Sequence, residues 1–586
     1  MVNLTGGQGT GLPSRPMAEE GLALGRLLFP QARQIKSLEQ YEALYPPRLL
    51  PPGAMVTRYA PSPTGFMHIG GIFVSLINKI LALQTGGVFF LRIEDTDTKR
   101  SIPGALDTII NAFAAYGLTS HEGLYRAEDG TLQERGAYGP YTQTERAAVY
   151  RDHAIALIQR GLAYPCFTSA EEIDELRARQ IAEGVKPGMY GRWAPWRDAP
   201  LEKVKNKVRE GAAFTIRLRA PDDASGLIKL KDGVRGVISM PANDLDTVLL
   251  KSDGIPTYHF AHAVDDHLMR TTHVIRGDEW ITSTPLHFQL FQALGFPPVE
   301  YVHVPPIQKI EHTEELDEKT GVRRTVESRR KLSKRKDPEA NIEFYDELGI
   351  PPSATIDYLL NIANSTFEEW REKNPHASYT KFPLKLNKMS PSGALSDVAK
   401  LRSISKDVIA RMSAEEIYPP GVAWARKYDP ELAVLMIRYE ERTKLALGIE
   451  RDTPRGNKRI VTWQDLRPQL AYFYDELYER IDTFDFPEQI PPDERRQLLL
   501  KLAKLCDSTE SNVPWFEKVR TISIECGYAP DLKQYKASPQ SYKGHVGDVS
   551  MLIRVALSGV RQTPDLLEIV RILGPQRYRE RLSRFC

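Results

Sequence analysis

The sequence predicts an α/β protein whose N-terminal half contains a parallel sheet and whose C-terminal half is all-α. Two observations predict the sheet: residues 55–60 and 88–93 have strand composition, and apolar residues recur at helical spacing between them. A strand, helix, strand unit of this kind joins parallel strands by a right-handed crossover. The third observation is that helical patterns dominate after Asn341. The fold class is therefore expected to be a Rossmann-like sheet domain, with an α+β insertion, followed by helices.

An N-terminal extension of residues 1–50 precedes the first predicted strand. Its first 18 residues are rich in Gly, Pro and Thr and lack the apolar stretch of a secretory signal, so partial disorder is expected. The acids Glu19 and Glu20, followed by leucines at 22, 24, 27 and 28, predict a short amphipathic helix.

The first half of the sheet domain is assigned to residues 51–149. The helix after the first strand has one apolar face, formed by Phe73, Leu76, Ile77, Ile80 and Leu81. Gly86-Gly87 supplies a left-handed stop before the second strand. In a sheet of this type the ligand crevice lies at the carboxyl ends of the strands.

An insertion is expected over residues 150–246 because the pattern changes there. A polar helix over 171–183 precedes alternating β-like stretches at 214–218 and 228–240. Parallel-sheet signals resume at 247–251 and 273–276, so the second half of the sheet domain is assigned to residues 247–345.

The C-terminal part is divided into helical regions at 346–480 and 481–586. Ser353 is expected to cap a helix with Ile356, Leu359, Leu360 and Ala363 on one face. Near the end, Thr563-Pro564-Asp565 is expected to open a helix that closes at Gly574.

Composition sets limits but does not point to a function. The 586 residues carry a net charge of only +2, which neither indicates nor excludes a nucleic-acid partner. No apolar run reaches the roughly 18 residues that a bilayer helix needs, so no membrane partner is expected. Four scattered cysteines without a Cys-x-x-Cys pair argue against a disulfide framework and fit the reducing cytoplasm.

The strongest motif lies between the first strand and the first helix. It contains small residues, which let the backbone approach phosphate, and it ends where a helix offers unpaired N–H groups. His68 can donate a hydrogen bond to a phosphoryl oxygen, although a lone histidine before a helix is more often a structural cap. The motif runs Arg58-Tyr59-Ala60-Pro61-Ser62-Pro63-Thr64-Gly65-Phe66-Met67-His68-Ile69-Gly70-Gly71.

A second motif is strongly basic: Arg329-Arg330-Lys331-Leu332-Ser333-Lys334-Arg335-Lys336. In isolation, such a cluster is usually a solvated face. Its position after the second half of the predicted nucleotide fold favours a phosphate-binding loop. Lys331 and Lys334 are flexible cations that can follow negative charge as it moves onto departing pyrophosphate.

Together the two motifs resemble the signatures of class I aminoacyl-tRNA synthetases, in the form found in bacterial-type glutamate–tRNA ligases. The similarity extends over nearly the whole ordered chain, including residues 346–370 and 552–559. It implies ATP-dependent activation of L-glutamate and its transfer to tRNA(Glu). It also implies catalytic roles for His68, Lys331 and Lys334, and an ATP site formed by His68, Gly70, Gly71, Glu279, Trp280, Leu332 and Lys334.

The same resemblance implies a glutamate pocket. A substrate with one amine and two carboxylates needs an anion for the amine and a guanidinium or hydroxyl for the carboxylates. The matching residues are Arg58, Ala60, Ser62, Glu94, Tyr258, His262 and Arg276. His262 stands where many relatives carry asparagine. The alternative to ligand binding is a purely structural role, which would be an ion pair for Arg276 and core packing for Trp280.

Mg²⁺ is expected with ATP, held mainly by phosphates and water. No structural zinc is expected, because Cys166 alone cannot form a closed site and more closely matches a small core residue. The chain is expected to be a monomer, with the insertion holding the tRNA acceptor end and the helical half binding the anticodon.

Four alternatives stay open at this point. An enzyme of the same family could charge tRNA(Gln) as well, or could be a glutamine–tRNA ligase, which Arg276 disfavours because a fixed cation suits a carboxylate. A truncated relative that glutamylates a tRNA base lacks the long C-terminal half. A catalytically silent tRNA-binding adaptor would not need His68, Lys331 and Lys334.

Overall fold

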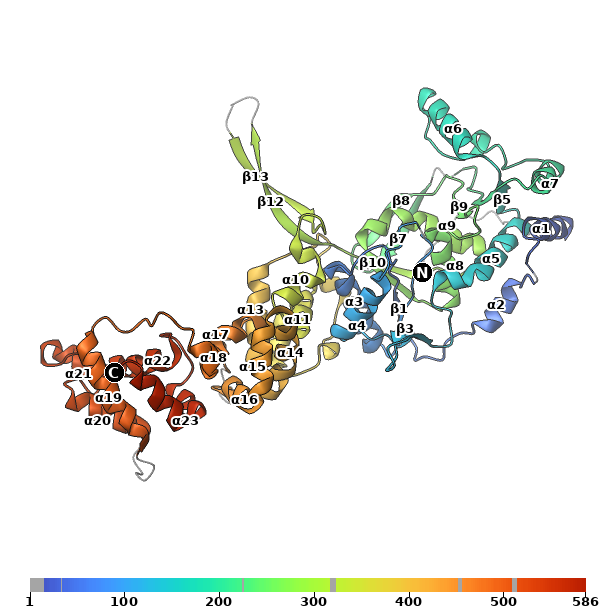
Figure 1. The fold of residues 1–586 in the computed structure, drawn as a ribbon. Helices are drawn as coiled ribbons and strands as arrows, with labels where there is room; N and C mark the ends of the chain where they lie inside the picture. The colour runs from blue at the N-terminus through green and yellow to red at the C-terminus, as the bar shows by residue number, and fades with distance from the viewer. Residues whose placement is uncertain are drawn as a thin grey trace. The chain divides into compact units, whose positions relative to one another are not determined.

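The computed structural model describes residues 15–586 apart from 33, 98, 224–225, 317–322, 452–455 and 508–513 (Figure 1). Two compact units are present. Unit 1 comprises Met1–Ile342 and Leu359–Ser396, and unit 2 comprises Glu343–Tyr358 and Asp397–Cys586. The expected disordered lead-in lies mostly outside the described residues. Among the described helices, none is long and apolar enough to cross a membrane.

The first half of the sheet in unit 1 is parallel, as predicted. Strand β1 (Val56–Tyr59) pairs with β2 (Val88–Leu91), with Val56 opposite Val88, and β2 pairs with β3 (Glu122–Arg126). A short antiparallel strand, β4 (Leu132–Arg135), forms the edge beside β3. Apolar side chains of β1 and β2 are buried on both faces, which is typical of a parallel sheet covered by helices.

The second half forms another four-stranded sheet, in the order β10, β11, β7, β8, whose strand β10 lies beside β1. Strands β10 (His273–Gly277) and β11 (Glu300–Val304) are parallel, and the N–H of Thr272 donates to the carbonyl of Val56 at 3.0 Å, which places β10 beside β1. A hairpin of β7 (Leu227–Asp232) and β8 (Gly236–Pro241) joins β11 through the register pair Tyr301 and Asp232. The Rossmann-like α/β class is therefore confirmed.

Helix α3 (Ile69–Gln84) covers the sheet between β1 and β2 and has the predicted apolar face, with Leu76, Ile77 and Ile80 fully buried. Its end requires glycine twice. Gly86 has φ +68°, and a Cβ on Gly87 would lie 1.9 Å from the carbonyl oxygen of Met55. The glycine pair therefore lets the chain turn tightly into β2.

The insertion contains an antiparallel sheet of β5 (Ala163–Cys166), β6 (Thr215–Leu218) and β9 (Val248–Leu250). Assignment of residues 247–251 to the parallel sheet is therefore wrong. A three-residue apolar strand fits either sheet, and its composition does not identify its partner. Cys166 is buried in a small core with Tyr164, Leu176 and Met189, as expected for a packing residue.

Helices α4 (Ala105–Ala115), α5 (Ala147–Gln159), α8 (Tyr258–Leu268) and α9 (Thr284–Leu294) lie around these sheets, whereas α6 (Ala170–Ala182) projects away from them (Figure 1). The predicted amphipathic helix near the N-terminus is present as α1 (Arg15–Leu28). Unit 1 also contains α2 (Leu38–Leu44), α7 (Leu201–Arg209) and α12 (Phe367–Lys373).

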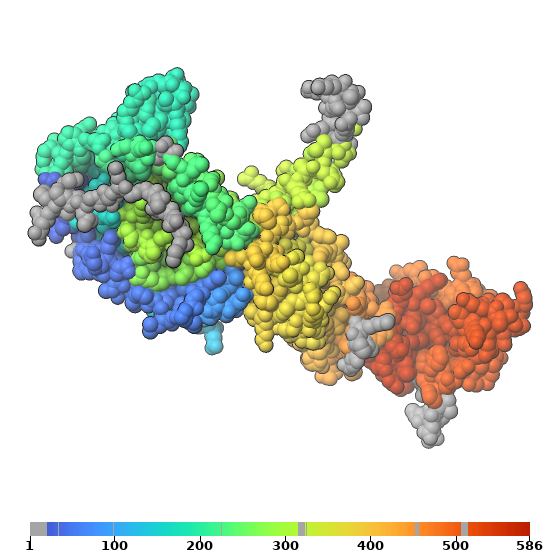
Figure 2. Space-filling view, turned by 180° about the vertical axis from the view of Figure 1, so that it is seen from behind, coloured from blue at the N-terminus to red at the C-terminus, as the bar shows by residue number. Residues whose placement is uncertain are grey.

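A long antiparallel hairpin leads into the basic motif. Strand β12 (Ile307–Leu316) pairs with β13 (Arg323–Lys331), and the short strand β14 (Ala394–Leu395) runs parallel to the base of β12. The hairpin stands out from the molecular surface (Figures 1 and 2). Because β13 ends at Lys331, the hairpin carries the basic loop directly.

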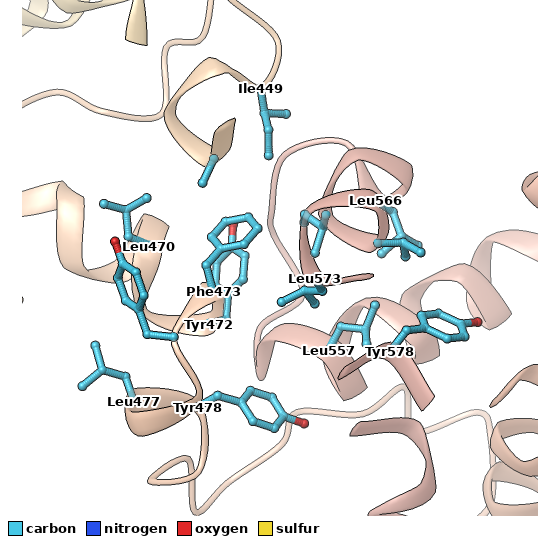
Figure 3. Packing of buried hydrophobic residues seen from close by; sticks show 14 of the residues in the cluster. Ile449, Leu470, Tyr472, Phe473, Leu477, Tyr478, Leu557, Leu566, Leu573 and Tyr578 are labelled. Atoms are coloured by element: carbon cyan, nitrogen blue, oxygen red, sulfur yellow. The ribbon is translucent and has the colours of Figure 1, made fainter. Parts of the chain in front are cut away.

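Unit 2 is helical, and one apolar core extends through it (Figure 3). Tyr472, Phe473 and Tyr478 pack beside Leu557 and Leu573. Its helices are α13 (Val398–Arg411), α14 (Ala414–Tyr428), α15 (Pro430–Arg438), α16 (Glu440–Gly448), α17 (Leu466–Leu470), α18 (Asp475–Tyr478), α19 (Pro492–Ala503), α20 (Trp515–Glu525), α21 (Leu532–Ala537), α22 (Val546–Ser558) and α23 (Leu566–Ser583).

One predicted helix end differs from the structure, and another falls where it was predicted. Helix α10 (Ile342–Glu347) and helix α11 (Pro352–Ala363) run from one unit into the other, and α11 begins at Pro352, so Ser353 lies inside it and is not its cap. Proline at the first helical position explains the earlier start, because its missing N–H needs no partner there. In α23 the helical geometry breaks at Gly574, with φ 78° and ψ 167°, at the predicted stop.

Candidate active site

One cavity of about 1320 Å³ opens in unit 1 at the carboxyl ends of β1, β2 and β10. Its wall contains residues of both motifs. From the predicted ATP and catalytic set it includes His68, Gly70, Gly71, Glu279, Trp280, Lys331 and Lys334, and from the predicted glutamate set Arg58, Ala60, Ser62, Glu94, Tyr258 and Arg276. His262 and Leu332 are not part of the wall. The two motifs, more than 250 residues apart in the chain, therefore meet at a single cavity.

His68 lies where the loop after β1 becomes helix α3. Its Nδ1 accepts a hydrogen bond from the N–H of Gly70 at 2.8 Å, so the ring caps the helix. Burial, together with the nearby charges of Lys334 and Lys331, lowers the pKa of His68 to about 4. A neutral ring whose Nδ1 is an acceptor carries its proton on Nε2. His68 can therefore donate from Nε2 to a phosphoryl oxygen.

Gly71 fits this loop for a steric reason. A Cβ at Gly71 would lie 2.4 Å from the hydroxyl oxygen of Tyr59, so there is no room for a side chain at this position. At Gly70 the added carbon would lie 3.0 Å from Nδ1 of His68, against the capping hydrogen bond. The small residues therefore bring the helix N-terminus, with its exposed N–H groups, to the cavity wall.

The lysine loop closes the same cavity from the other half of the fold. Nζ of Lys331 lies 3.1 Å from Oε2 of Glu279, and Nζ of Lys334 donates to the carbonyl of Phe66 at 2.5 Å. Lys334 thus reaches the first motif directly. Leu332 points into the core instead, and its N–H donates to the carbonyl of Ile307. An apolar side chain at this position anchors the loop.

An ionic clamp that the sequence did not reveal holds the loop in a turn. Arg330 donates from both terminal nitrogens to the buried carboxylate of Asp337, at 2.5 and 2.8 Å. The same carboxylate accepts the N–H of Ser333 at 2.8 Å. Asp337 therefore ties both ends of the lysine segment together. In the sequence, the only indication of this ion pair is that an acidic residue, Asp337, follows Arg330 by seven positions, just after the basic motif.

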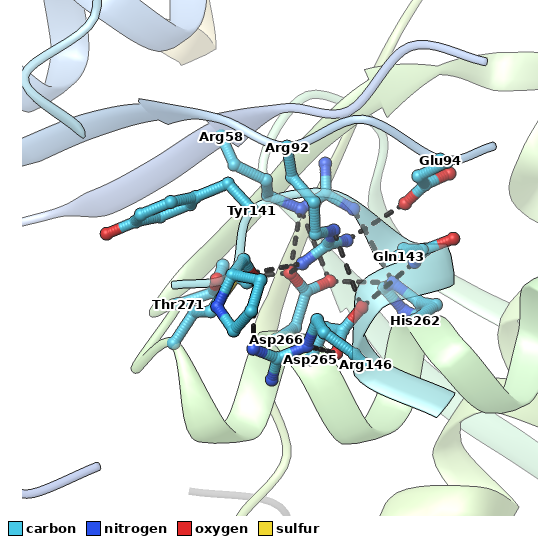
Figure 4. A network of polar contacts seen from close by, with 12 residues as sticks. Arg58, Arg92, Glu94, Tyr141, Gln143, Arg146, His262, Asp265, Asp266 and Thr271 are labelled. Atoms are coloured by element: carbon cyan, nitrogen blue, oxygen red, sulfur yellow. Dashed lines mark hydrogen bonds and ion pairs between the residues drawn. The ribbon is translucent and has the colours of Figure 1, made fainter. Parts of the chain in front are cut away.

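Below the cavity, a buried network of charges orients the first-half side chains (Figure 4). Asp266 accepts from Nε of Arg58 at 3.0 Å and from Arg92 at 2.8 Å, and Arg92 also donates to Glu94 at 3.0 Å. Asp265 accepts from Arg146 at 2.7 Å. Burial raises the pKa of Glu94, against the opposing effect of Arg92 and Arg58. Arg58 and Glu94 are thus fixed at the cavity wall.

The ring of Tyr258 reaches the wall, whereas His262 lies behind it. The Tyr258 and Trp280 rings are 4.3 Å apart, so Trp280 is part of the cavity lining. Four residues along α8, the His262 ring bonds Oδ2 of Asp266 at 2.6 Å and the hydroxyl of Tyr301 at 3.0 Å. His262 is on the same face of α8 as Tyr258 but one turn further along the helix, which explains why it lies behind the cavity wall. Burial lowers the pKa of His262 to about 3.

The surroundings of Arg276 contain further residues that sequence reasoning missed. His259 lines the cavity next to Tyr258 and contacts His287, which contacts Arg276 in turn. His303 contacts Arg276 on the other side. Arg276 is not one half of a structural ion pair, because no carboxylate of the described residues pairs with it.

Metal chemistry has little support from the side chains. Over the part of the chain that the structure describes, no group of three His, Cys, Asp or Glu side chains is placed to hold a metal ion.

The parallel sheet, the helix-capping histidine at its carboxyl edge and the lysine loop opposite define the class I aminoacyl-tRNA synthetase architecture. A family model described as "tRNA synthetases class I (E and Q), catalytic domain" matches residues 54–378, and one described as "Anticodon binding domain" matches residues 533–586. The chain belongs to the E and Q family of class I tRNA synthetases. Membership in this class implies the use of ATP.

Known relatives agree with this assignment. The chain is 62% identical to a glutamate–tRNA ligase of Sorangium cellulosum over 96% of its own length and 100% of the relative's. It is 43% identical to a glutamate–tRNA ligase of Clostridium perfringens over 97% of its length and 100% of the relative's. A crystal structure of a glutamate tRNA ligase from Elizabethkingia meningosepticum in complex with its amino acid is similar with a TM-score of 0.66 and 26% identity, covering 91% of this chain and 99% of that one.

Proposed function

We propose that the protein joins L-glutamate to tRNA(Glu) in two ATP-dependent steps. The glutamate carboxylate attacks the α-phosphate of ATP and releases pyrophosphate. The terminal ribose hydroxyl of the tRNA then attacks the glutamyl adenylate and releases AMP. The observation that carries this proposal is the meeting of His68 and Lys334 at one cavity that also holds buried arginines. The names of the full-length relatives support it.

The chemical steps need no nucleophile from the protein. Displacement at phosphorus depends mainly on alignment and on charge stabilisation. The Nε2 proton of His68 would meet a phosphoryl oxygen from the side of α3. Lys331 and Lys334 would meet the charge that develops on pyrophosphate, because the lysine loop faces the same cavity.

Glutamate would be bound by the fixed groups at the bottom of the cavity. Glu94 would face the amine, and the guanidinium groups of Arg58 and Arg276 would face the two carboxylates. Ser62 and Tyr258 would add hydroxyl contacts. The roles of Glu279 and Trp280 would be to flank ATP, next to Lys331 and Tyr258 respectively.

The remaining assignments follow from the same proposal. The insertion at 150–246 would bind the acceptor stem, residues 346–480 would contact the tRNA stem and begin the anticodon-binding region, and 481–586 would complete it. Mg²⁺ would accompany ATP, bound mainly by phosphates and water, because the phosphate charge needs neutralising. We further propose a cytoplasmic monomer.

Exchange of labelled pyrophosphate into ATP tests the proposal. Exchange is expected with glutamate at saturating tRNA(Glu), and little with glutamine. Absence of exchange under these conditions would contradict the enzyme function and favour an adaptor that only binds tRNA. Exchange with glutamine in place of glutamate would identify a glutamine–tRNA ligase.

A charging assay on both tRNAs separates the last alternative. Aminoacylation of tRNA(Glu) alone is expected. Glutamate attached to tRNA(Gln) at a similar rate would instead identify a non-discriminating enzyme, with unchanged chemistry in the cavity.

A further inference from the structure

Arg276 is held by neutral acceptors. Its Nε donates to Nε2 of His303 at 3.1 Å, and its Nη1 to Nδ1 of His287 at 3.1 Å. Its Nη2 donates to the carbonyl of Trp280 at 3.2 Å and to the hydroxyl of Thr284 at 3.1 Å. The guanidinium also lies over the ring of Tyr301, 4.8 Å from its centre. These contacts orient the cation without neutralising it.

These contacts leave one N–H group of Arg276 for a ligand. A guanidinium has five N–H groups and no acceptor, and four of them are used by the contacts above. Among the described residues, the second hydrogen on Nη1 has no acceptor. Since Arg276 lines the cavity, this N–H and the charge behind it are available to a carboxylate oxygen.

Because a guanidinium can only donate, the contacts also fix which nitrogen of each histidine carries a proton. Nε2 of His303 must accept from Arg276, so its Nδ1 carries the proton and donates to Asp232 at 2.8 Å. Nδ1 of His287 must accept from Arg276, so its Nε2 donates to Nδ1 of His259 at 2.9 Å. His259 is then protonated on Nε2, in a ring that lines the cavity.

Burial and the charge of Arg276 keep these rings neutral. Burial is the main cause that lowers the pKa of His287 and of His303, and Arg276 lowers both further. Asp232, the carboxylate bound to His303, is separated from Arg276 by the whole imidazole of that histidine. Asp232 itself is held by the N–H groups of Val234 and Arg235 in the turn of the β7–β8 hairpin.

We propose that Asp232, His303 and His287 are positioning residues that hold Arg276 through neutral acceptors, so that its charge is reserved for the side-chain carboxylate of the amino-acid substrate. The proposal rests on the proposed function and deepens it. A direct carboxylate partner would neutralise Arg276 and leave little preference for a charged substrate over its amide. Hydrogen bonds to an ionised acceptor are roughly twice as strong as neutral ones, so an available cation favours glutamate over glutamine.

A matched pair of variants at one position tests the charge argument. Asn and Asp have nearly the same shape, and either can place an oxygen near the present position of Nδ1 of His287. His287→Asn keeps a neutral acceptor and is expected to raise KM for glutamate by no more than about threefold. His287→Asp adds a carboxylate beside Arg276 and is expected to raise it at least about tenfold, with KM for ATP unchanged and a reduced preference for glutamate over glutamine. Equal effects of the two variants on KM for glutamate would overturn the proposal.

A measurement on the unaltered protein gives a second test that does not depend on folding of the variants or on activity. Nitrogen-15 NMR of labelled histidine distinguishes the two neutral forms and the cation. At pH 7.5 His303 is expected to be protonated on Nδ1, and His287 and His259 on Nε2. A cationic ring or the opposite form at His303 or His287 would overturn the proposal. Failure of glutamate-dependent exchange in the same preparation would instead contradict the proposed function.

Discussion

Two kinds of cation line the cavity, and they are held in opposite ways. Two of the cavity's arginines, Arg58 and Arg276, are buried and fixed by several contacts each: Arg58 by Asp266 and Arg276 by imidazoles. Lys331 and Lys334 lie on a loop at the surface, and the side chain of Lys331 is 52% exposed. A fixed charge recognises a substrate of fixed shape, whereas a charge on a flexible stem can follow a leaving group. The difference indicates which cations select and which assist the reaction.

The largest expected effect comes from breaking the fixed side of this comparison. Asp266→Ala removes the acceptor shared by Arg58 and Arg92 and leaves buried charge uncompensated. Removal of one partner of a buried pair typically costs about 3–5 kcal/mol. Urea unfolding should show a loss in free energy of that size.

The control for this variant is Lys205→Ala, which removes an exposed ion pair with Glu202. Exposed pairs contribute roughly 0–1 kcal/mol, so its unfolding free energy should hardly change. Similar losses in the two variants would show that burial does not distinguish these ion pairs.

Breaking the surface side of the comparison should affect rate and leave stability alone. Lys334→Ala is expected to slow adenylate formation by about 100-fold or more, as for the loss of one group that stabilises transition-state charge. Binding of tRNA should change far less. Single-turnover kinetics and a tRNA binding assay measure the two effects, and equal losses in both would contradict the assigned role. Lys336→Ala, which removes a neighbouring cation outside the cavity wall, is the matched control.

A smaller effect is expected where the lysine loop is held by Asp337. Asp337→Asn keeps the shape of the clamp but removes its charge towards Arg330, and adenylate formation should slow by about tenfold through misplacement of the loop. Glu311→Gln removes the charge of the other carboxylate that contacts Arg330, which also lies 4.0 Å from Nζ of the exposed Lys336 but does not bind the backbone of the loop, and should have little effect. The pyrophosphate exchange rate measures both. A rise in KM for glutamate with an unchanged exchange rate in Asp337→Asn would show that the clamp does not serve the loop.

The smallest expected effect concerns His68, whose ring should not change its charge over the usual working range of pH. Because burial and the two lysines lower its pKa to about 4, the ring should stay neutral from pH 8 down to about 5. An unfolded chain would bind the proton near pH 6.5, so this group destabilises the fold progressively as pH falls from about 6.5 towards 4 and has no effect above that range. The ring C–H resonance, assigned with His68→Asn, should not shift between pH 8 and 5. A midpoint near 6.5 would contradict the described burial.

Local patterns predicted much of this molecule. Strand composition located β1, β2 and β10, helical spacing located α3, and both motifs met at the cavity as expected. The misassigned strand β9 shows the limit of such patterns, because a short apolar run does not indicate its partner. His262 is similar: its helix was predictable, but its depth behind Tyr258 was not.

The surroundings of Arg276 depend on contacts between distant segments. His303 meets Asp232, 71 residues away, because Tyr301 on β11 pairs in register with Asp232 on β7. His259 and His287 come together across α8 and α9. No spacing within either segment indicates these pairings, since they depend on the packing of the complete sheet and its helices.

The start of α3 has a consequence for proton direction. A backbone N–H occupies the only lone pair that the neutral His68 ring can offer at Nδ1. The other nitrogen must then bear hydrogen before any ligand arrives, so towards the cavity the ring can give a hydrogen bond but cannot receive one. The N-terminus of α3 thereby determines that His68 is a donor towards the cavity. A ligand that presents its own donor to Nε2 would find no acceptor there.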